Sequence, residues 1–154
     1  LPVAIGWFAV DGQQQFLTGN ASATLAVAAL GTVLYLWQFP HFMAIAWLYR
    51  DQYRLAGLKM LTVTDPSGLR AAGQSLAASL AMVPVSLSMA VPSGSIRMFL
   101  AAALASTLYV LVSVNFAFRR DDRSARILLF ASLGVLLILM TSAIAFSSPK
   151  VLSG

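Results

Sequence analysis

Cysteine and glutamate are both absent from this chain, and histidine occurs only once. Without cysteine, the chain has no disulfide, no thiolate metal site and no thiol redox chemistry. All five acidic residues are aspartates, so any reaction that depends on carboxylates has very few candidate residues. The single imidazole, on His41, has no second histidine to form a multi-histidine metal site with.

Charge of either sign is also scarce. Charged residues make up 10% of the chain, hydrophobic residues make up 59%, and the mean hydropathy is +0.82. A soluble domain usually carries about a quarter charged residues. We therefore predict an all-α integral membrane protein whose surroundings are the lipid bilayer. The net charge is +5, but the ten basic residues form no stripe, so no nucleic-acid partner is expected.

Four apolar stretches are long enough to cross a bilayer as helices, at about 21–49, 72–91, 96–118 and 127–147. The first ten residues are apolar too, but they are too short to span. No linker or internal repeat divides the chain, which predicts a single membrane domain over residues 1–154. The sequence opens abruptly on an apolar stretch, so we expect more protein upstream.

The basic residues are concentrated in alternate connections between these spans. Residues 50–71 and 119–126 hold eight of the ten, whereas the other two are Arg97 and Lys150. Cytoplasmic loops of membrane proteins carry an excess of lysine and arginine. Loops 50–71 and 119–126 are therefore predicted to be cytoplasmic.

The first span carries the strongest functional pattern. Gln38 and His41 are three residues apart, so on a helix they share one face. Pro40 between them removes a backbone hydrogen bond and favours a kink. Polar groups are costly in hydrocarbon, which indicates an interior site, although a helix-packing pair is the alternative. A histidine there could bind a haem iron or donate to a carboxylate or diphosphate, and the spacing does not choose between these.

A polar cluster follows the same span and contains Arg50, Asp51, Tyr53, Arg54 and Lys59. A collar of snorkelling basic side chains explains Arg54 and Lys59, but it does not explain Asp51. A carboxylate surrounded by cations suits a Mg²⁺–diphosphate site, because the metal bridges carboxylate and phosphate oxygens.

Two segments resemble a known family. They are Trp37-Gln38-Phe39-Pro40-His41-Phe42 and the run from Tyr49-Arg50-Asp51 to Lys59-Met60-Leu61. Together they resemble the haem O synthases, the protohaem IX farnesyltransferases of the UbiA-type prenyltransferase superfamily. The opening Pro2-Val3-Ala4-Ile5-Gly6-Trp7 resembles the Pro-Pro-x-x-Gly-Trp segment that precedes this region in the family.

The resemblance implies a bundle of nine spans in the cytoplasmic (inner) membrane, with this chain as its C-terminal half. Farnesyl diphosphate and haem b would be the substrates, and Mg²⁺ would hold the diphosphate between two acidic motifs. The first motif would lie in the missing N-terminal half, so the chain alone should be inactive.

Carried over by position, the resemblance makes Asp51 a catalytic and metal-binding carboxylate, with Arg50 and Tyr53 as its catalytic neighbours. It makes the substrate-binding residues Gln38, His41, Arg54 and Lys59. Two positions depart from the family pattern: Gln52 stands where an acid usually precedes the tyrosine, and Leu55 stands where a second acid is usual in the superfamily.

A second hypothesis needs no catalysis. Intramembrane histidine and glutamine also mark transport pathways. On this reading the chain is a non-catalytic membrane module, such as a transporter half or an assembly subunit, that binds haem through His41.

Overall fold

The computed structural model describes residues 5–6, 21–92 and 94–146. Four long helices account for most of these residues: α3 (Ala21–Leu48), α6 (Leu69–Ser88), α7 (Ile96–Arg119) and α8 (Asp122–Phe146). All four are long and apolar enough to cross a membrane. A helix satisfies its own backbone hydrogen bonds, which hydrocarbon cannot do, so these apolar sequences fold this way. The predicted all-α fold with four membrane helices is confirmed.

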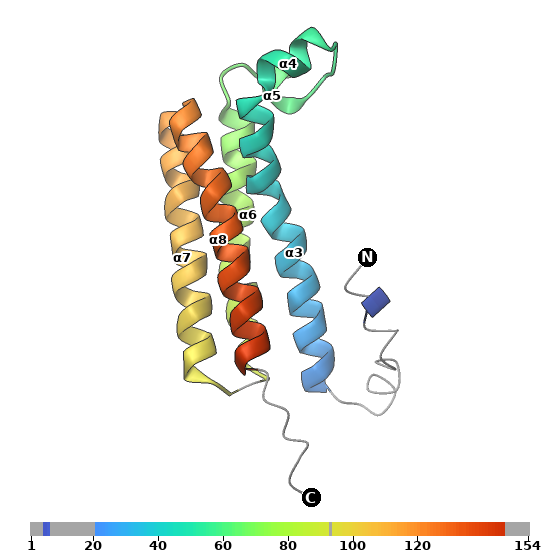
Figure 1. The fold of residues 1–154 in the computed structure, drawn as a ribbon, viewed down its shortest axis with the longest axis vertical. Helices are drawn as coiled ribbons and strands as arrows, with labels where there is room; N and C mark the ends of the chain where they lie inside the picture. Colours follow the sequence, from blue (N-terminus) through green and yellow to red (C-terminus); the bar gives the residue numbers. More distant parts are fainter. Residues whose placement is uncertain (1–4, 7–20, 93, 147–154) are drawn as a thin grey trace, which may run out of the picture.

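The four helices run alternately up and down and form a closed bundle (Figure 1). α3 packs on α6, α6 on α7, α7 on α8, and α8 on α3 again. α3 continues as a helix through Pro40, and α6 continues through Pro84.

Because the helices alternate in direction, eight basic residues lie at or near the end of the bundle that carries α4 (Arg50–Leu55) and α5 (Leu61–Thr64), while Arg97 lies at the other end. Lys150 falls outside the described residues.

Small residues line the contacts between the helices. Serines at these contacts are fully buried, and several donate their hydroxyl protons to carbonyls of their own helix: Ser75, Ser79, Ser86 and Ser106. A serine satisfied in this way takes up little space, so neighbouring backbones approach closely. The largest fully buried side chains are Tyr109, Phe116, Met82 and Leu128.

The helix boundaries differ from the predicted spans in two places. α6 begins at Leu69 rather than near residue 72, and α8 begins at Asp122 rather than near residue 127. The early start of α8 has a local cause: the Asp121 carboxylate accepts a hydrogen bond from the Ser124 N–H at 2.7 Å. This satisfies one free donor of the first turn. The hydrogen bonds from Ser124 also lower the pKa of Asp121.

The connection over residues 50–71, predicted as a polar loop, contains the two short helices α4 and α5 and the first residues of α6. α5 is anchored to α3 by the buried Thr62 hydroxyl, which donates to the Ala46 carbonyl at 2.8 Å. A turn forms at Asp65-Pro66-Ser67-Gly68, with the Gly68 N–H donating to the Asp65 carbonyl at 3.1 Å. This turn brings the chain back over the end of α3.

Candidate functional site

The only histidine sits where α3 and α8 meet. His41 Nδ1 lies 2.8 Å from the Ser132 hydroxyl oxygen, and the Trp37 indole N–H donates to the Ser132 carbonyl at 2.7 Å. The Trp37 and His41 rings are stacked one helical turn apart, with centroids 4.7 Å apart. Ser132 of α8 is therefore the hydrogen-bond partner of both Trp37 and His41 of α3.

The hydrogen bonds around Ser132 fix the tautomer of His41. The Ser132 hydroxyl donates its single proton to the Leu129 carbonyl at 2.6 Å, so towards His41 it acts as the acceptor. Nδ1 of His41 therefore carries the proton, and in the neutral ring Nε2 is a bare acceptor. Within the described part of the chain, Nε2 has no hydrogen-bond partner. Such a nitrogen can accept a proton or ligate a metal ion.

A third helix joins the same network. Tyr109 of α7 is fully buried, and its hydroxyl donates to the Trp37 carbonyl at 2.9 Å. This carbonyl lies in the turn of α3 that contains Pro40, where the helical hydrogen-bond ladder is interrupted. α7 and α8 thus both hold the segment of α3 that presents His41.

Gln38 does not share this environment. Its side chain is exposed, on a face of α3 that also exposes Tyr35 and Phe42. Among the described residues Gln38 forms no hydrogen bond with His41, so the two polar residues that their spacing paired have different surroundings.

The polar cluster beyond α3 is divided between two ion pairs. Arg50 donates to the Trp47 carbonyl and to Asp122 of α8, both at 2.7 Å, and its guanidinium lies 4.8 Å from the centre of the Trp47 ring. Asp51, next along the chain, pairs instead with Arg54 at 2.9 Å. Arg50 therefore ties α4 to the start of α8, while Asp51 lies on the exposed surface of α4.

The remaining predicted site residues, Tyr53 and Lys59, form no hydrogen bond or ion pair through their side chains within the described segments. Tyr53 is half-buried on α4, and Lys59 is exposed between α4 and α5. No group of three histidine or acidic residues that could hold a metal occurs in the described segments. Asp51 offers one carboxylate, already paired with Arg54, so the described residues do not by themselves form a Mg²⁺ site.

Sequence reasoning selected His41 but missed the residues that hold it. Ser132 and Tyr109 resemble the other small or aromatic residues of apolar spans, and only their position opposite α3 distinguishes them. Trp37 could have been found, because it lies too deep for an interfacial tryptophan and one turn before the histidine.

Comparison with known proteins gives these features a context. A model of the UbiA prenyltransferase family matches residues 1–137. The protoheme IX farnesyltransferase of Rhodopirellula baltica is 40% identical over 152 residues, which is 92% of this chain and 50% of that protein. The protoheme IX farnesyltransferase of Solibacter usitatus is 42% identical over 129 residues, 80% of this chain and 44% of that protein.

A more distant relative is the mitochondrial protoheme IX farnesyltransferase of Arabidopsis thaliana, 39% identical over 85 residues, 55% of this chain and 18% of that protein. No solved structure gave a significant match. The chain spans about half the length, or less, of these curated relatives. The family match covers most of the chain, and the four long helices make up most of the described residues. The chain belongs to the UbiA prenyltransferase family.

Proposed function

We propose that the protein transfers a farnesyl group from farnesyl diphosphate to the vinyl group of protohaem IX, in haem O biosynthesis, and that this chain supplies one half of the reaction cavity. The support is the name shared by its relatives together with the geometry of α3 and α4. These relatives do not favour the non-catalytic alternative.

The observation that carries the proposal is the position of the charged cluster relative to His41. Arg50, Arg54 and Lys59 at the end of α3 outnumber the two carboxylates that pair with them, Asp51 and Asp122. His41 lies on the same helix, about 14 Å below Arg50 at 1.5 Å per residue. An anionic head bound at the cluster would place an attached apolar chain alongside the helix that carries His41.

The proposed chemistry follows from this arrangement. The basic residues bind the diphosphate and stabilise the negative charge that grows as it leaves, which produces an allylic cation. The vinyl group of haem then forms a carbon–carbon bond to the allylic cation, and the carbocation left on the former vinyl group adds water and loses a proton to give the hydroxyl product. Asp51 is proposed to share a Mg²⁺ with the diphosphate, with the remaining ligands from outside the described residues. Tyr53 and the exposed Gln38 are proposed to line the cavity once the rest of the protein covers them.

The role of Asp51 is tested by haem O production in cells whose only farnesyltransferase is this protein in its native sequence context. We expect Asp51→Asn to lower haem O at least tenfold. Asp65→Asn makes the same charge change at the same end of the bundle, and it should leave haem O near the wild-type level. Unchanged haem O in Asp51→Asn would refute the metal role.

Arg50 needs a different control, because it also holds Asp122. Arg50→Gln and Asp122→Asn both remove that ion pair, but only Arg50→Gln removes the guanidinium from the proposed diphosphate site. We expect haem O to fall in Arg50→Gln and to persist in Asp122→Asn. An equal loss in both variants would assign Arg50 a structural role.

We also propose that the protein lies in the cytoplasmic membrane with α4 and α5 in the cytoplasm. These 154 residues contain no cysteine, so an introduced cysteine is the only one among them, and the test uses a background in which any other cysteine of the protein is replaced. A membrane-impermeant maleimide added to intact cells should label Arg97→Cys and spare Lys59→Cys. The reverse pattern would invert the topology.

A further inference from the structure

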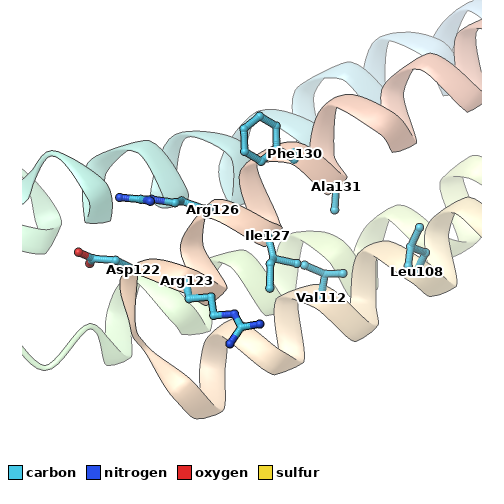
Figure 2. Close-up of a pocket in the computed structure, with 8 residues that line it drawn as sticks. All are labelled: Leu108, Val112, Asp122, Arg123, Arg126, Ile127, Phe130 and Ala131. Atoms are coloured by element: carbon cyan, nitrogen blue, oxygen red, sulfur yellow. The ribbon is translucent and has the colours of Figure 1, made fainter.

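A groove runs between α7 and α8 and meets the candidate site at Asp122, the ion-pair partner of Arg50 (Figure 2). It has a volume of about 600 Å³. Its walls are apolar, with Val112 of α7 and Ile127 of α8 facing each other, and Leu108 and Ala131 at the deep end. Phe130, 69% exposed, forms part of the same wall. None of these residues belongs to the His41 network or to the α4 cluster.

The groove has the length of one membrane leaflet. Leu108 lies eleven residues before the end of α7, and Ala131 lies nine residues after the start of α8. At 1.5 Å per residue these positions are about 17 Å and about 14 Å below the helix ends. Half of the hydrocarbon core of a bilayer is about 15 Å thick. An acyl chain of the nearer leaflet therefore has the right length for this groove.

Positive charge is concentrated at the shallow end. Arg123 and Arg126 lie there in the first turns of α8, beside Asp122 (Figure 2). The Asp122 carboxylate is engaged by Arg50. Arg123 and Arg126 make no hydrogen bond or ion pair within the segments that the structure describes. The apolar groove thus ends at two arginines that form no ion pair among the described residues, beside an Asp122 carboxylate that is already paired with Arg50.

Helix stability does not explain these arginines. A cation in the first turn of a helix opposes its dipole, which makes Arg123 unfavourable there, and Arg126 lies beyond that turn, so neither arginine stabilises α8 through the dipole. The preference for basic residues on the cytoplasmic side accounts for charge at this end of the bundle. It does not account for two charges at the mouth of an apolar groove.

We propose that the α7–α8 groove binds an anionic phospholipid from the leaflet at the α4 end of the bundle. Its acyl chain lies along Val112 and Ile127, and its phosphate group lies between Arg123 and Arg126. Each basic residue near a membrane surface strengthens attraction to anionic lipid by about fivefold. Two arginines should therefore favour phosphatidylglycerol over phosphatidylcholine by about 30-fold.

The experiment measures lipid retention by native mass spectrometry after the protein, in its native sequence context, is extracted from vesicles of mixed phosphatidylglycerol and phosphatidylcholine. The wild type should retain phosphatidylglycerol selectively, and R123Q/R126Q should lose that selectivity. R70Q, which removes an exposed arginine at the same end of the bundle but outside the groove, should keep it. Because neither removed charge stabilises α8 through the dipole, the double variant should fold, and R123K/R126K should restore selectivity.

A second readout locates the lipid. The chain has three native tryptophans, so the readout is the extra fluorescence of F130W over wild type, which should be quenched more strongly by brominated phosphatidylglycerol than by brominated phosphatidylcholine. The proposal is overturned if the wild type shows no selectivity, if R70Q loses it equally, or if quenching at F130W is the same for both lipids. Displacement of phosphatidylglycerol by stoichiometric farnesyl diphosphate would also overturn it, because the groove would then belong to the prenyl substrate.

Discussion

Substituting Gly68 by alanine should destabilise the bundle through one close contact. Gly68 adopts a left-handed backbone with φ of +71°, and a Cβ there would overlap Cζ3 of Trp47 and lie 2.9 Å from its Cη2. Real Cβ atoms essentially never approach other atoms this closely, so either the turn or the indole has to move.

The indole has little room to move. Trp47 is only 6% exposed, it packs edge-on against Phe116 at 6.0 Å, and the Arg50 guanidinium covers its face. Overpacking a well-packed site costs about 1–3 kcal/mol, and the left-handed backbone adds about 1–2 kcal/mol for a residue with a Cβ. We therefore expect Gly68→Ala to lower the free energy of unfolding by about 2–5 kcal/mol.

Gly57 provides a matched control. It has nearly the same backbone, with φ of +70°, but a Cβ there would meet nothing within 4 Å. Gly57→Ala should therefore cost only the backbone contribution of about 1–2 kcal/mol. The difference between the two variants measures the contact with Trp47.

The assay is reversible unfolding in mixed micelles with a rising fraction of denaturing detergent, followed by helix content. Trp47→Phe should partly rescue Gly68→Ala, because phenylalanine lacks the indole atoms that clash. It also loses no hydrogen bond, since the buried Trp47 N–H has no partner among the described residues. Equal destabilisation by Gly57→Ala and Gly68→Ala, or no rescue, would refute this reasoning.

Three further predictions concern single interactions. Tyr109→Phe removes the hydrogen bond to the Trp37 carbonyl and should cost about 0.6–1.7 kcal/mol in the same unfolding assay, as interhelical hydrogen bonds in membranes do. A double-mutant cycle on Arg50 and Asp122 should give a coupling of about 0.2–1 kcal/mol that weakens with added salt, because the Asp122 side chain is 53% exposed. The pKa of Asp121 is lowered in the folded state, so its stabilising effect is present above the ordinary carboxyl pKa of about 3.9 and is lost as pH falls below it. Unfolding titrations should therefore show a steeper acid loss of stability in wild type than in Asp121→Asn.

The sequence predicts the membrane helices well because hydrocarbon imposes one strong constraint on apolar stretches of this length. It predicts the start of α8 poorly. The charged residues near Asp121 have the composition of a loop, whereas a hydrogen bond from Ser124 to the Asp121 side chain allows the helix to begin there. Local capping outweighs composition at that boundary.

The site was predictable only in part, for a geometric reason. Residues three apart on a helix are separated by about 60° around its axis, so one can face a neighbouring helix while the other faces away. His41 turns toward α8 and Gln38 does not. Which of the two turns inward depends on the rotation of α3 against Ser132, 91 residues later in the chain, and a pattern within α3 does not contain that information.

That separation in sequence has a consequence for biosynthesis. The hydrogen bonds from α3 to Ser132 join residues 91 and 95 positions apart. At a synthesis rate of about 5–20 residues per second, roughly 5 to 20 seconds pass between the emergence of His41 and that of its partner. Throughout this interval the imidazole and the indole N–H lack the serine that satisfies them. Pairing of α6 with α7 needs no such wait, whereas the ring of helices closes onto α3 only after α8 has followed it into the membrane.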